Sequence, residues 1–382
     1  MDTKRQRTSN GPPKATLVYE GCANFRQRLV LACITSRPVR IVKIRPDDEC
    51  PGLASFEASF VRLLDKLTNG TSVEINEVGT TLSFRPGIII GGSIDHDCCG
   101  DQNDSRSVGW FLEGILPMAP FAKKPFQISF DNCITNDEMD PSVDMIKEVA
   151  FPILRRFGVA NDEETNNMLS LQVKSRGARP LGGGVVEFRC STVRELIPID
   201  WIDAGLIKRV RGVAYSTKVS PQVANRCIFS SRGILNNLLP DVYVFSDVYS
   251  GKTSGKSPGF GVLLTAESNT GSMICAEVVA EVGTLPEDVG ESCAQLLLQE
   301  VMEGGCVDST HQPLVLMMMA LGPEDVTRIR VGKLTQSAMG TLRLLRDFLG
   351  VTFKVKPDIG DANTVLLSCL GCGYKNVAKQ VT

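Results

Sequence analysis

Histidine is scarce in this chain, and its scarcity limits the chemistry that the sequence can support. Only two histidines occur among 382 residues, His96 in an expected polar loop and His311 before Gln312-Pro313. Histidine is the commonest general acid or base, and a frequent covalent nucleophile in phosphoryl transfer. We interpret both as surface or packing residues, which leaves little room for histidine catalysis.

Long apolar runs and a strong net charge are also missing. The longest uninterrupted apolar stretch, 314–321, is far shorter than the roughly 18 residues that a membrane span needs. The formal net charge is only −2, so the field of the whole chain does not attract nucleic acid from a distance. Any contact with RNA or phosphate must therefore come from local basic patches.

The thirteen cysteines are scattered, and no signal peptide precedes them. This pattern favours a reducing compartment, the cytosol or the nucleus. Cys369 and Cys372 form a C-x-x-C pair, but no second pair lies at zinc-site spacing, and Cys98-Cys99 with His96 would complete a site only by coincidence. We predict free or buried thiols, no metal and no cofactor.

The basic N-terminal tail, residues 1–15, carries Lys4, Arg5, Arg7 and Lys14 among turn-forming residues. Its composition is typical of disorder. It is either a weak nuclear-import signal or simply a solvated tail.

Short β-branched runs alternate with helical stretches in the rest of the chain, which favours an α/β or α+β fold. The order suggests βαβ-like units of roughly 80 residues. A shift in composition near 176–188 and a loop-rich stretch at 249–261 indicate a smaller α/β domain, 186–285, inserted into a large domain of residues 16–185 and 286–382. The pattern predicts strands at 39–44, 80–92 and 126–132, and helices at 52–70, 107–119, 141–158, from Ser220-Pro221 onward, and at 285–305.

Two glycine-rich segments allow more than one interpretation. "SGKTSGKS", 250–257, nearly matches a phosphate-binding loop, but Ser250 replaces its first glycine and Pro258-Gly259 would prevent the helix that must follow. We favour a simple turn. In "PLGGGVVEF", 180–188, the glycines permit either close approach to a ligand or a tight turn into a strand.

Local basic clusters are either solvated faces or contacts to phosphate. One of these clusters lies at the strand-to-helix junction of residues 330–350. The helix expected there has an apolar stripe of Ala338, Leu342, Leu345 and Leu349, and Thr335 or Ser337 can cap its start. The clusters are Lys174, Arg176 and Arg179; Lys208, Arg209 and Arg211; Arg328, Arg330 and Lys333; and Arg343 and Arg346.

Several stretches, in order from about 17 to 375, resemble the RNA 3′-terminal phosphate cyclase family. They include "LVLACITSRPVRIVKIRPDDECPGL", "VGTTLSFRPGIIIGG", "PILRRFG", "RPLGGGVVEF" and "SPGFGVLLTAE". The resemblance implies a large domain of three repeated units, each a four-stranded sheet on two helices, with a small α/β domain inserted. Active members attack ATP with a histidine, form a covalent adenylate, and close a 2′,3′-cyclic phosphate on RNA.

This sequence departs from the family pattern where the chemistry occurs. The histidine position falls on Ser337, and no histidine lies within twenty residues of it. Carboxylates stand where the family has basic residues, and they would repel an RNA end. Arg26 and Arg45 remain, so the resemblance leaves an anion pocket without a nucleophile. The other departures are Cys22 and Ala23 in the glycine-rich loop, Asp47, Asp48 and Glu49 in the basic run, Pro313-Leu314 at an Asp-Gln pair, and Glu113 at a glutamine.

These departures are similar to those of the family's eukaryotic branch that lacks cyclase activity. That resemblance implies a nuclear, nucleolar factor of the small-subunit processome, which acts in early pre-rRNA cleavage for 18S rRNA and 40S assembly and has a ribosome-assembly GTPase as partner. Arg26, Arg45, Arg176, Arg179, Arg328, Arg330 and Lys333 are the candidate anion or RNA contacts. One alternative is an endoribonuclease that cuts pre-rRNA with Arg343, Arg346 and Asp347; another is a cyclase with an unrelated nucleophile.

Overall fold

The computed structural model describes residues 15–98, 105–160, 168–358 and 363–379. The basic tail up to residue 14 lies outside these ranges, as does Cys99. No helix in the described ranges combines the length and the apolar character that crossing a membrane requires.

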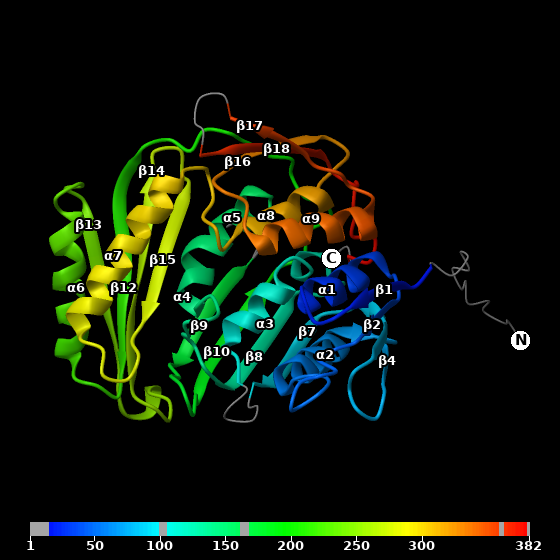
Figure 1. Ribbon diagram of the computed structural model, residues 1–382, viewed down its shortest axis with the longest axis horizontal. Coiled ribbons are helices and arrows are strands. Elements are labelled where there is room, and N and C mark those ends of the chain that lie inside the picture. Colours follow the sequence, from blue (N-terminus) through cyan, green and yellow to red (C-terminus); the bar gives the residue numbers. More distant parts are fainter. Residues whose placement is uncertain (1–14, 99–104, 161–167, 359–362, 380–382) are drawn as a thin grey trace, which may run out of the picture.

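Three units of the same topology, β-α-β-α-β-β, build the larger part of the molecule (Figure 1). In each sheet the first strand pairs parallel with the second, the second antiparallel with the fourth, and the fourth antiparallel with the third. The second and third sheets, β7-β8-β10-β9 and β11-β16-β18-β17, repeat this order. These observations confirm the predicted α/β class and the expected repeats of a four-stranded sheet on two helices.

The first unit runs β1 (Leu17–Glu20), α1 (Phe25–Thr35), β2 (Val39–Val42), α2 (Ser55–Leu67), β4 (Ser72–Ile75), β5 (Leu82–Arg85). The second runs β7 (Gly92–Asp97), α3 (Val108–Ile115), β8 (Phe126–Cys133), α4 (Val143–Met145), a π-turn (Ile146–Ala150), α5 (Phe151–Arg156), β9 (Leu169–Ser175), β10 (Gly184–Cys190). The third runs β11 (Asp200–Trp201), α8 (Gln312–Leu321), β16 (Val326–Val331), α9 (Gln336–Leu349), β17 (Lys354–Pro357), β18 (Val365–Leu370).

A fourth sheet, β13-β12-β14-β15, has its own hydrophobic core and is inserted between β11 and α8. Helices α6 and α7 cover one face of this sheet, and its other face is turned toward the second unit (Figure 1). Its elements are β12 (Ile207–Thr217), α6 (Pro221–Leu235), β13 (Val242–Tyr249), β14 (Gly259–Ser268), β15 (Met273–Val279) and α7 (Pro286–Glu303).

The pairing and packing lead us to propose 207–303 as the smaller unit, in place of 186–285. Strand β10 belongs to the second large sheet, and β11 pairs with β16. Helix α7 buries Val289, Cys293 and Leu297 in the core of the inserted sheet. A composition shift marks the loops around an element, but it does not tell which core the element joins.

Several local expectations are corrected by backbone chemistry. The strand expected over 80–92 divides into β5, β6 (Ile88–Ile89) and the start of β7; Pro86, which has no N–H to donate, lies in the break. Strand β6 pairs with β3 (Thr68–Asn69) and not with the four-stranded sheet. The helix expected over 141–158 contains a π-turn just before Pro152, whose missing N–H removes one helical hydrogen bond.

The glycine-rich segments serve the chain's own packing. Residues 251–253 form one 3₁₀ turn and strand β14 begins at Gly259, so no helix follows to hold phosphates. A Cβ at Gly255 would lie 2.4 Å from the Gly182 carbonyl oxygen, and Gly182 and Gly183 have φ of 59° and 84°. The tight-turn interpretation of "PLGGG" is therefore the one the structure supports.

Candidate functional site

The beginnings of α1, α8 and α9 meet beside α3, where the family's chemistry would be expected. Thr335 caps α9 by accepting a hydrogen bond from the Ala338 N–H at 3.1 Å, and Ser337 is exposed in the first turn. Helix α9 lies against the start of α1, since a Cβ on Gly340 would be 2.3 Å from the Asn24 amide nitrogen. The Ser337 hydroxyl is thus presented at the surface.

The predicted apolar stripe of α9 is only partly right. Ala338 and Leu345 are buried, whereas Leu342 and Leu349 are half-buried at the edge of the core. The centre of the buried face is displaced toward Thr341, Leu344 and Phe348, which are all buried.

Arg26, one of the two arginines expected to keep an anion pocket, is neutralised by a carboxylate. Its guanidinium lies 2.8 Å from Glu113 on α3, and both side chains are mostly shielded from water, at 14% and 23% exposure. It also donates to the Trp110 carbonyl and lies over the Trp110 ring at 4.8 Å. An anion at Arg26 would therefore have to compete with an ion already in place.

Arg45 is neutralised in the same way. Its guanidinium forms a two-pronged ion pair with Glu57, which is 4% exposed, and donates to the Gly52 carbonyl at 3.1 Å. The Glu57 carboxylate also accepts the Ala54 N–H at 3.0 Å and so fixes the start of α2. Asp47, Asp48 and Glu49 are exposed in the turn after Arg45. The carboxylates at this edge oppose the binding of a phosphate.

The other predicted contacts are spread over the molecule, and most of them are paired. Arg176 is 1% exposed and bonded to Asp144 and Asp247. Arg179 pairs with Asp137, Arg328 with Asp200, and Arg330 with Asp358. Lys333 is exposed beside an apolar groove of about 840 Å³. The seven residues do not form one basic surface.

The other members of two basic clusters also lie near carboxylates, Lys174 only at long distance. Glu267 binds both Lys208 and Arg209, at 2.7 and 2.6 Å. Arg211 pairs with Asp241 at 2.8 Å, and Lys174 lies 3.6 Å from Glu187.

His96 is buried in β7, which corrects the expected polar loop. It is 3% exposed, and its Nε2 lies 3.0 Å from the Ser59 hydroxyl. Burial, assisted by the nearby Lys66 charge, lowers the pKa of His96 to about 4. It is a neutral packing histidine at physiological pH.

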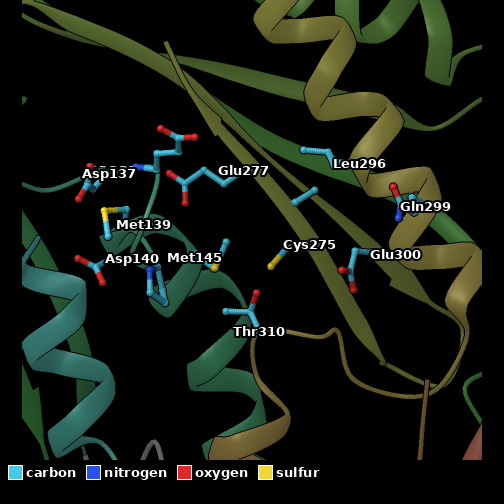
Figure 2. Close-up of a pocket in the computed structure, with 13 residues that line it drawn as sticks. Asp137, Met139, Asp140, Met145, Cys275, Glu277, Leu296, Gln299, Glu300 and Thr310 are labelled. Carbon is cyan, nitrogen blue, oxygen red and sulfur yellow. Dashed lines mark hydrogen bonds between the residues drawn. The ribbon is translucent and has the colours of Figure 1, made fainter. Parts of the chain in front are cut away.

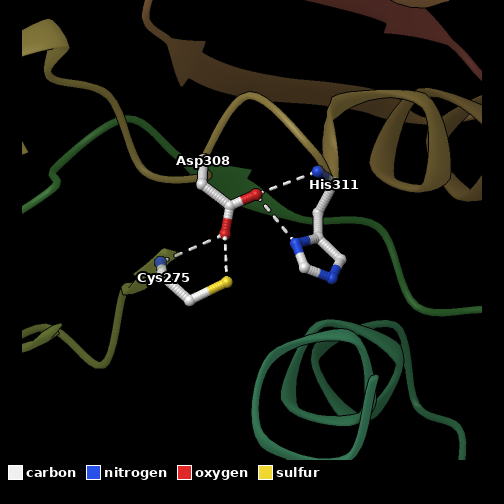
Figure 3. A group of neighbouring side chains, drawn as sticks. All are labelled: Cys275, Asp308 and His311. Carbon is white, nitrogen blue, oxygen red and sulfur yellow. Dashed lines mark hydrogen bonds and ion pairs between the residues drawn. The ribbon is translucent and has the colours of Figure 1, made fainter. Parts of the chain in front are cut away.

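His311 is also buried, where it begins α8 beside Asp308 (Figure 3). The Asp308 carboxylate lies 2.7 Å from His311 Nδ1 and accepts the His311 N–H at 2.9 Å; its other oxygen accepts the N–H and the thiol of Cys275. Burial alone would lower the pKa of His311, but the carboxylate charges of Asp308, Glu113 and Glu300 raise it.

The ligand atoms of Cys275, Asp308 and His311 lie within 4.8 Å of one another and are of types that bind metals. Each Asp308 oxygen already takes part in two hydrogen bonds, so a purely structural role accounts for the trio. It ties β15 of the inserted unit to the start of α8.

Gln312, directly after His311, links the start of α8 to the start of α9. Its amide donates to the Lys333 carbonyl and accepts the Thr335 N–H, both at 3.0 Å. Sequence reasoning placed importance on Pro313-Leu314 and missed the roles of Gln312, Asp308 and Glu57. It named Glu113 as a departure from the family pattern but not as the partner of Arg26. In the sequence these residues show only as polar side chains near apolar helical stretches, and that pattern does not identify the group that each side chain binds.

An acidic cavity of about 280 Å³ lies between the inserted unit and the second unit (Figure 2). Asp137, Asp140, Glu277 and Glu300 line it. Burial raises the pKa of Glu277 to about 7, although hydrogen bonds from Asn136 and Ser142 oppose the shift. The carboxylates that line this cavity would repel a phosphate.

Comparison with known proteins identifies the scaffold. The family described as RNA 3′-terminal phosphate cyclase matches residues 17–355. The chain belongs to this family. It is 46% identical over 374 residues to the RNA 3′-terminal phosphate cyclase-like protein of Homo sapiens, covering 95% of this chain and 98% of the relative. It is 37% identical over 378 residues to the rRNA processing protein RCL1 of Saccharomyces cerevisiae, covering 98% and 100%.

The similarity to the Dictyostelium discoideum relative, named a probable RNA 3′-terminal phosphate cyclase-like protein, is 44% over 379 residues, covering 95% of this chain and 99% of that one. The resemblance predicted from the motifs, to the family and to its cyclase-like branch, is thereby confirmed.

Proposed function

We propose that this chain is a ribosomal RNA processing factor that uses the cyclase scaffold without its chemistry. Two relatives that match over nearly their whole length are named rRNA processing proteins. The observation that carries the loss of chemistry is the Arg26–Glu113 ion pair, 2.8 Å long, beside an α9 that starts without a histidine. The missing nucleophile and the filled anion position are independent, so one compensating substitution would not restore the reaction.

The finer assignment follows from the family branch. We propose action in early pre-rRNA cleavage for 18S rRNA, in the nucleolus, within the small-subunit processome and together with a ribosome-assembly GTPase. A scaffold without catalysis acts through its surfaces, and Lys333 and the exposed face of α9 are surfaces available for a partner.

The first prediction concerns covalent chemistry. Purified full-length protein incubated with radiolabelled ATP and RNA bearing a 3′-phosphate is expected to give neither a protein-bound nucleotide nor a cyclised end. Ser337→His is expected to stay inactive too, because Glu113 still occupies Arg26. An active cyclase assayed in parallel serves as the positive control. A denaturation-resistant adduct that disappears in Ser337→Ala would overturn the proposal.

The second prediction concerns the cell. Depletion of the protein is expected to reduce 18S rRNA several-fold relative to the large-subunit rRNA, measured by northern blotting of precursors and products. Re-expression of Ser337→Ala is expected to restore 18S rRNA as fully as the unaltered chain, because no reaction uses that hydroxyl. Normal 18S rRNA after depletion would contradict a role in rRNA processing.

The nuclease alternative, through Arg343, Arg346 and Asp347, has a competing structural account. The Asp347 carboxylate accepts from the Tyr19 hydroxyl at 3.3 Å and its carbonyl accepts from Arg37 at 2.7 Å, so it joins α9 to the first unit. Arg346 lies 3.6 Å from Asp347 and is mostly exposed. Specific cleavage of naked pre-rRNA that is lost in Arg346→Ala would favour the nuclease.

A further inference from the structure

The inserted sheet exposes two aromatic side chains on its edge strand, β13. Tyr243 and Phe245 are 54% and 53% exposed, and their rings pack edge to face with centroids 4.5 Å apart. In the described part of the chain, Phe229 is the one other aromatic residue among the exposed large hydrophobic side chains. Tyr243 and Phe245 alternate with Val242 and Val244, which are buried beneath the helices, so both rings lie on the opposite face of the sheet.

That face continues toward the junction between the inserted unit and the second unit. The β12–β13 register is regular from Val210–Val242 to Thr217–Tyr249, so Tyr243, Phe245 and Tyr249 point to the same side, with Asp247, which is bonded to Arg176, between the last two. At a rise of about 3.3 Å per residue, Tyr243 and Tyr249 lie roughly 20 Å apart. This length accommodates a few nucleotides of an extended strand.

A groove of about 370 Å³ adjoins the face at Asp247 and Tyr249, which belong to its lining. Its carboxylates, Asp144 and Asp247, are both bonded to the buried Arg176. Lys147 and Lys174 also line it, are 58% and 51% exposed, and have only long ion pairs, 3.7 and 3.6 Å, to Glu148 and Glu187. Three cations against two carboxylates leave the groove lining with a net charge of +1, and the two ammonium groups are its most exposed cations.

We propose that this aromatic face and the adjoining lysines bind single-stranded RNA. Unpaired bases stack on Tyr243 and Phe245, while Lys147 and Lys174 bind phosphates of the same strand. Aromatic side chains beside mobile cations are the combination that single strands require, because stacking accepts any base and the lysines follow the backbone. Double-stranded RNA does not fit this requirement, since its bases are stacked within the helix.

The proposal goes beyond the role in rRNA processing and rests on it only for which RNA is bound in the cell. The binding surface is separate from the start of α9 and from the acidic cavity. A homopolymer binding assay therefore fails or succeeds independently of the 18S rRNA experiment.

The test is fluorescence anisotropy of a labelled 12-nucleotide oligouridine with the full chain. Stacking contributes about 1–3 kcal/mol per base, so the loss of both rings in Tyr243→Ala/Phe245→Ala is expected to weaken binding by about 30-fold or more. Tyr243→Trp is expected to keep the affinity, since stacking does not need the hydroxyl. Phe229→Ala, which removes a ring on α6 that is 82% exposed, is the control and is expected to leave the affinity unchanged.

The lysines are tested by the dependence of affinity on salt. Each phosphate contact to a single strand contributes about −0.7 to the slope of log affinity against log salt, so Lys147→Glu/Lys174→Glu is expected to flatten it by about 1.4. Lys354→Glu/Lys356→Glu on β17 is the charge-matched control. No binding by the unaltered chain, or equal loss in the controls, overturns the proposal. Unchanged affinity of the aromatic double variant also overturns it and assigns the rings to a protein partner.

Discussion

Replacing Arg176 by methionine is expected to lower the free energy of unfolding by roughly 3–5 kcal/mol at pH 7. The guanidinium is 1% exposed and donates to Asp144, Asp247 and the Asn136 amide oxygen at 2.6 to 3.1 Å. Removing it leaves the Asp144 carboxylate without its charged partner. Urea unfolding followed by circular dichroism measures the loss.

The dependence of this loss on pH identifies its cause. Burial by itself would raise the pKa of Asp144, but Arg176 and the hydrogen bonds hold it below its usual value. A carboxyl with a depressed folded-state pKa stabilises the protein above its unfolded pKa and loses this contribution as pH falls through the folded value. The difference between the two proteins should therefore be largest near pH 7 and smaller below about pH 4.

Two comparisons make the test specific. Arg346→Met removes an arginine that is 65% exposed, and it should change the stability by less than about 0.5 kcal/mol. Arg176→Met/Asp144→Leu should regain part of the loss, because an apolar pair of similar volume does not leave a buried charge. A loss below about 1 kcal/mol, or one that does not vary with pH, would contradict the assigned role.

Arg176 also shows where sequence reasoning reaches its limit. In the sequence it belongs to a basic cluster with Lys174 and Arg179, and a phosphate contact is a reasonable prediction. Its actual partners, Asp144 and Asp247, lie 32 and 71 residues away along the chain. Local charge patterns carry no information about carboxylates that the fold brings from other elements.

Features that depend on local chemistry were predicted well. The α/β class followed from hydrophobic periodicity, and the starts of α6 and α9 from Ser220 and from Thr335, one of its two proposed caps. Ser337 as the position of the missing nucleophile stays a prediction from the order of the motifs. The Arg26–Glu113 ion pair could not be predicted, because it forms only when α3 packs beside α1.

Asp308→Ala is the second variant for which we expect a large effect. It should lower the free energy of unfolding by roughly 3–5 kcal/mol below pH 6.5. The variant leaves buried groups of His311 and Cys275 without their acceptor, and an imidazolium without its counter-ion. Because Gln312 follows directly and binds the Lys333 carbonyl, the loss should reach the start of α9. Hydrogen exchange of the Thr335–Ala338 amides is then expected to become faster.

The pH dependence again distinguishes the mechanism, and its sign is opposite to that of Arg176. The folded-state pKa of His311 is raised above its unfolded value, so the pair stabilises fully below about pH 6.5 and less as pH rises through the folded pKa. The loss in Asp308→Ala should therefore be greater at pH 6 than at pH 9. Asp65→Ala, at an exposed carboxylate on α2, should cost less than about 0.5 kcal/mol at either pH. An equal loss at both pH values would show that Asp308 acts only as a hydrogen-bond acceptor and that His311 stays neutral.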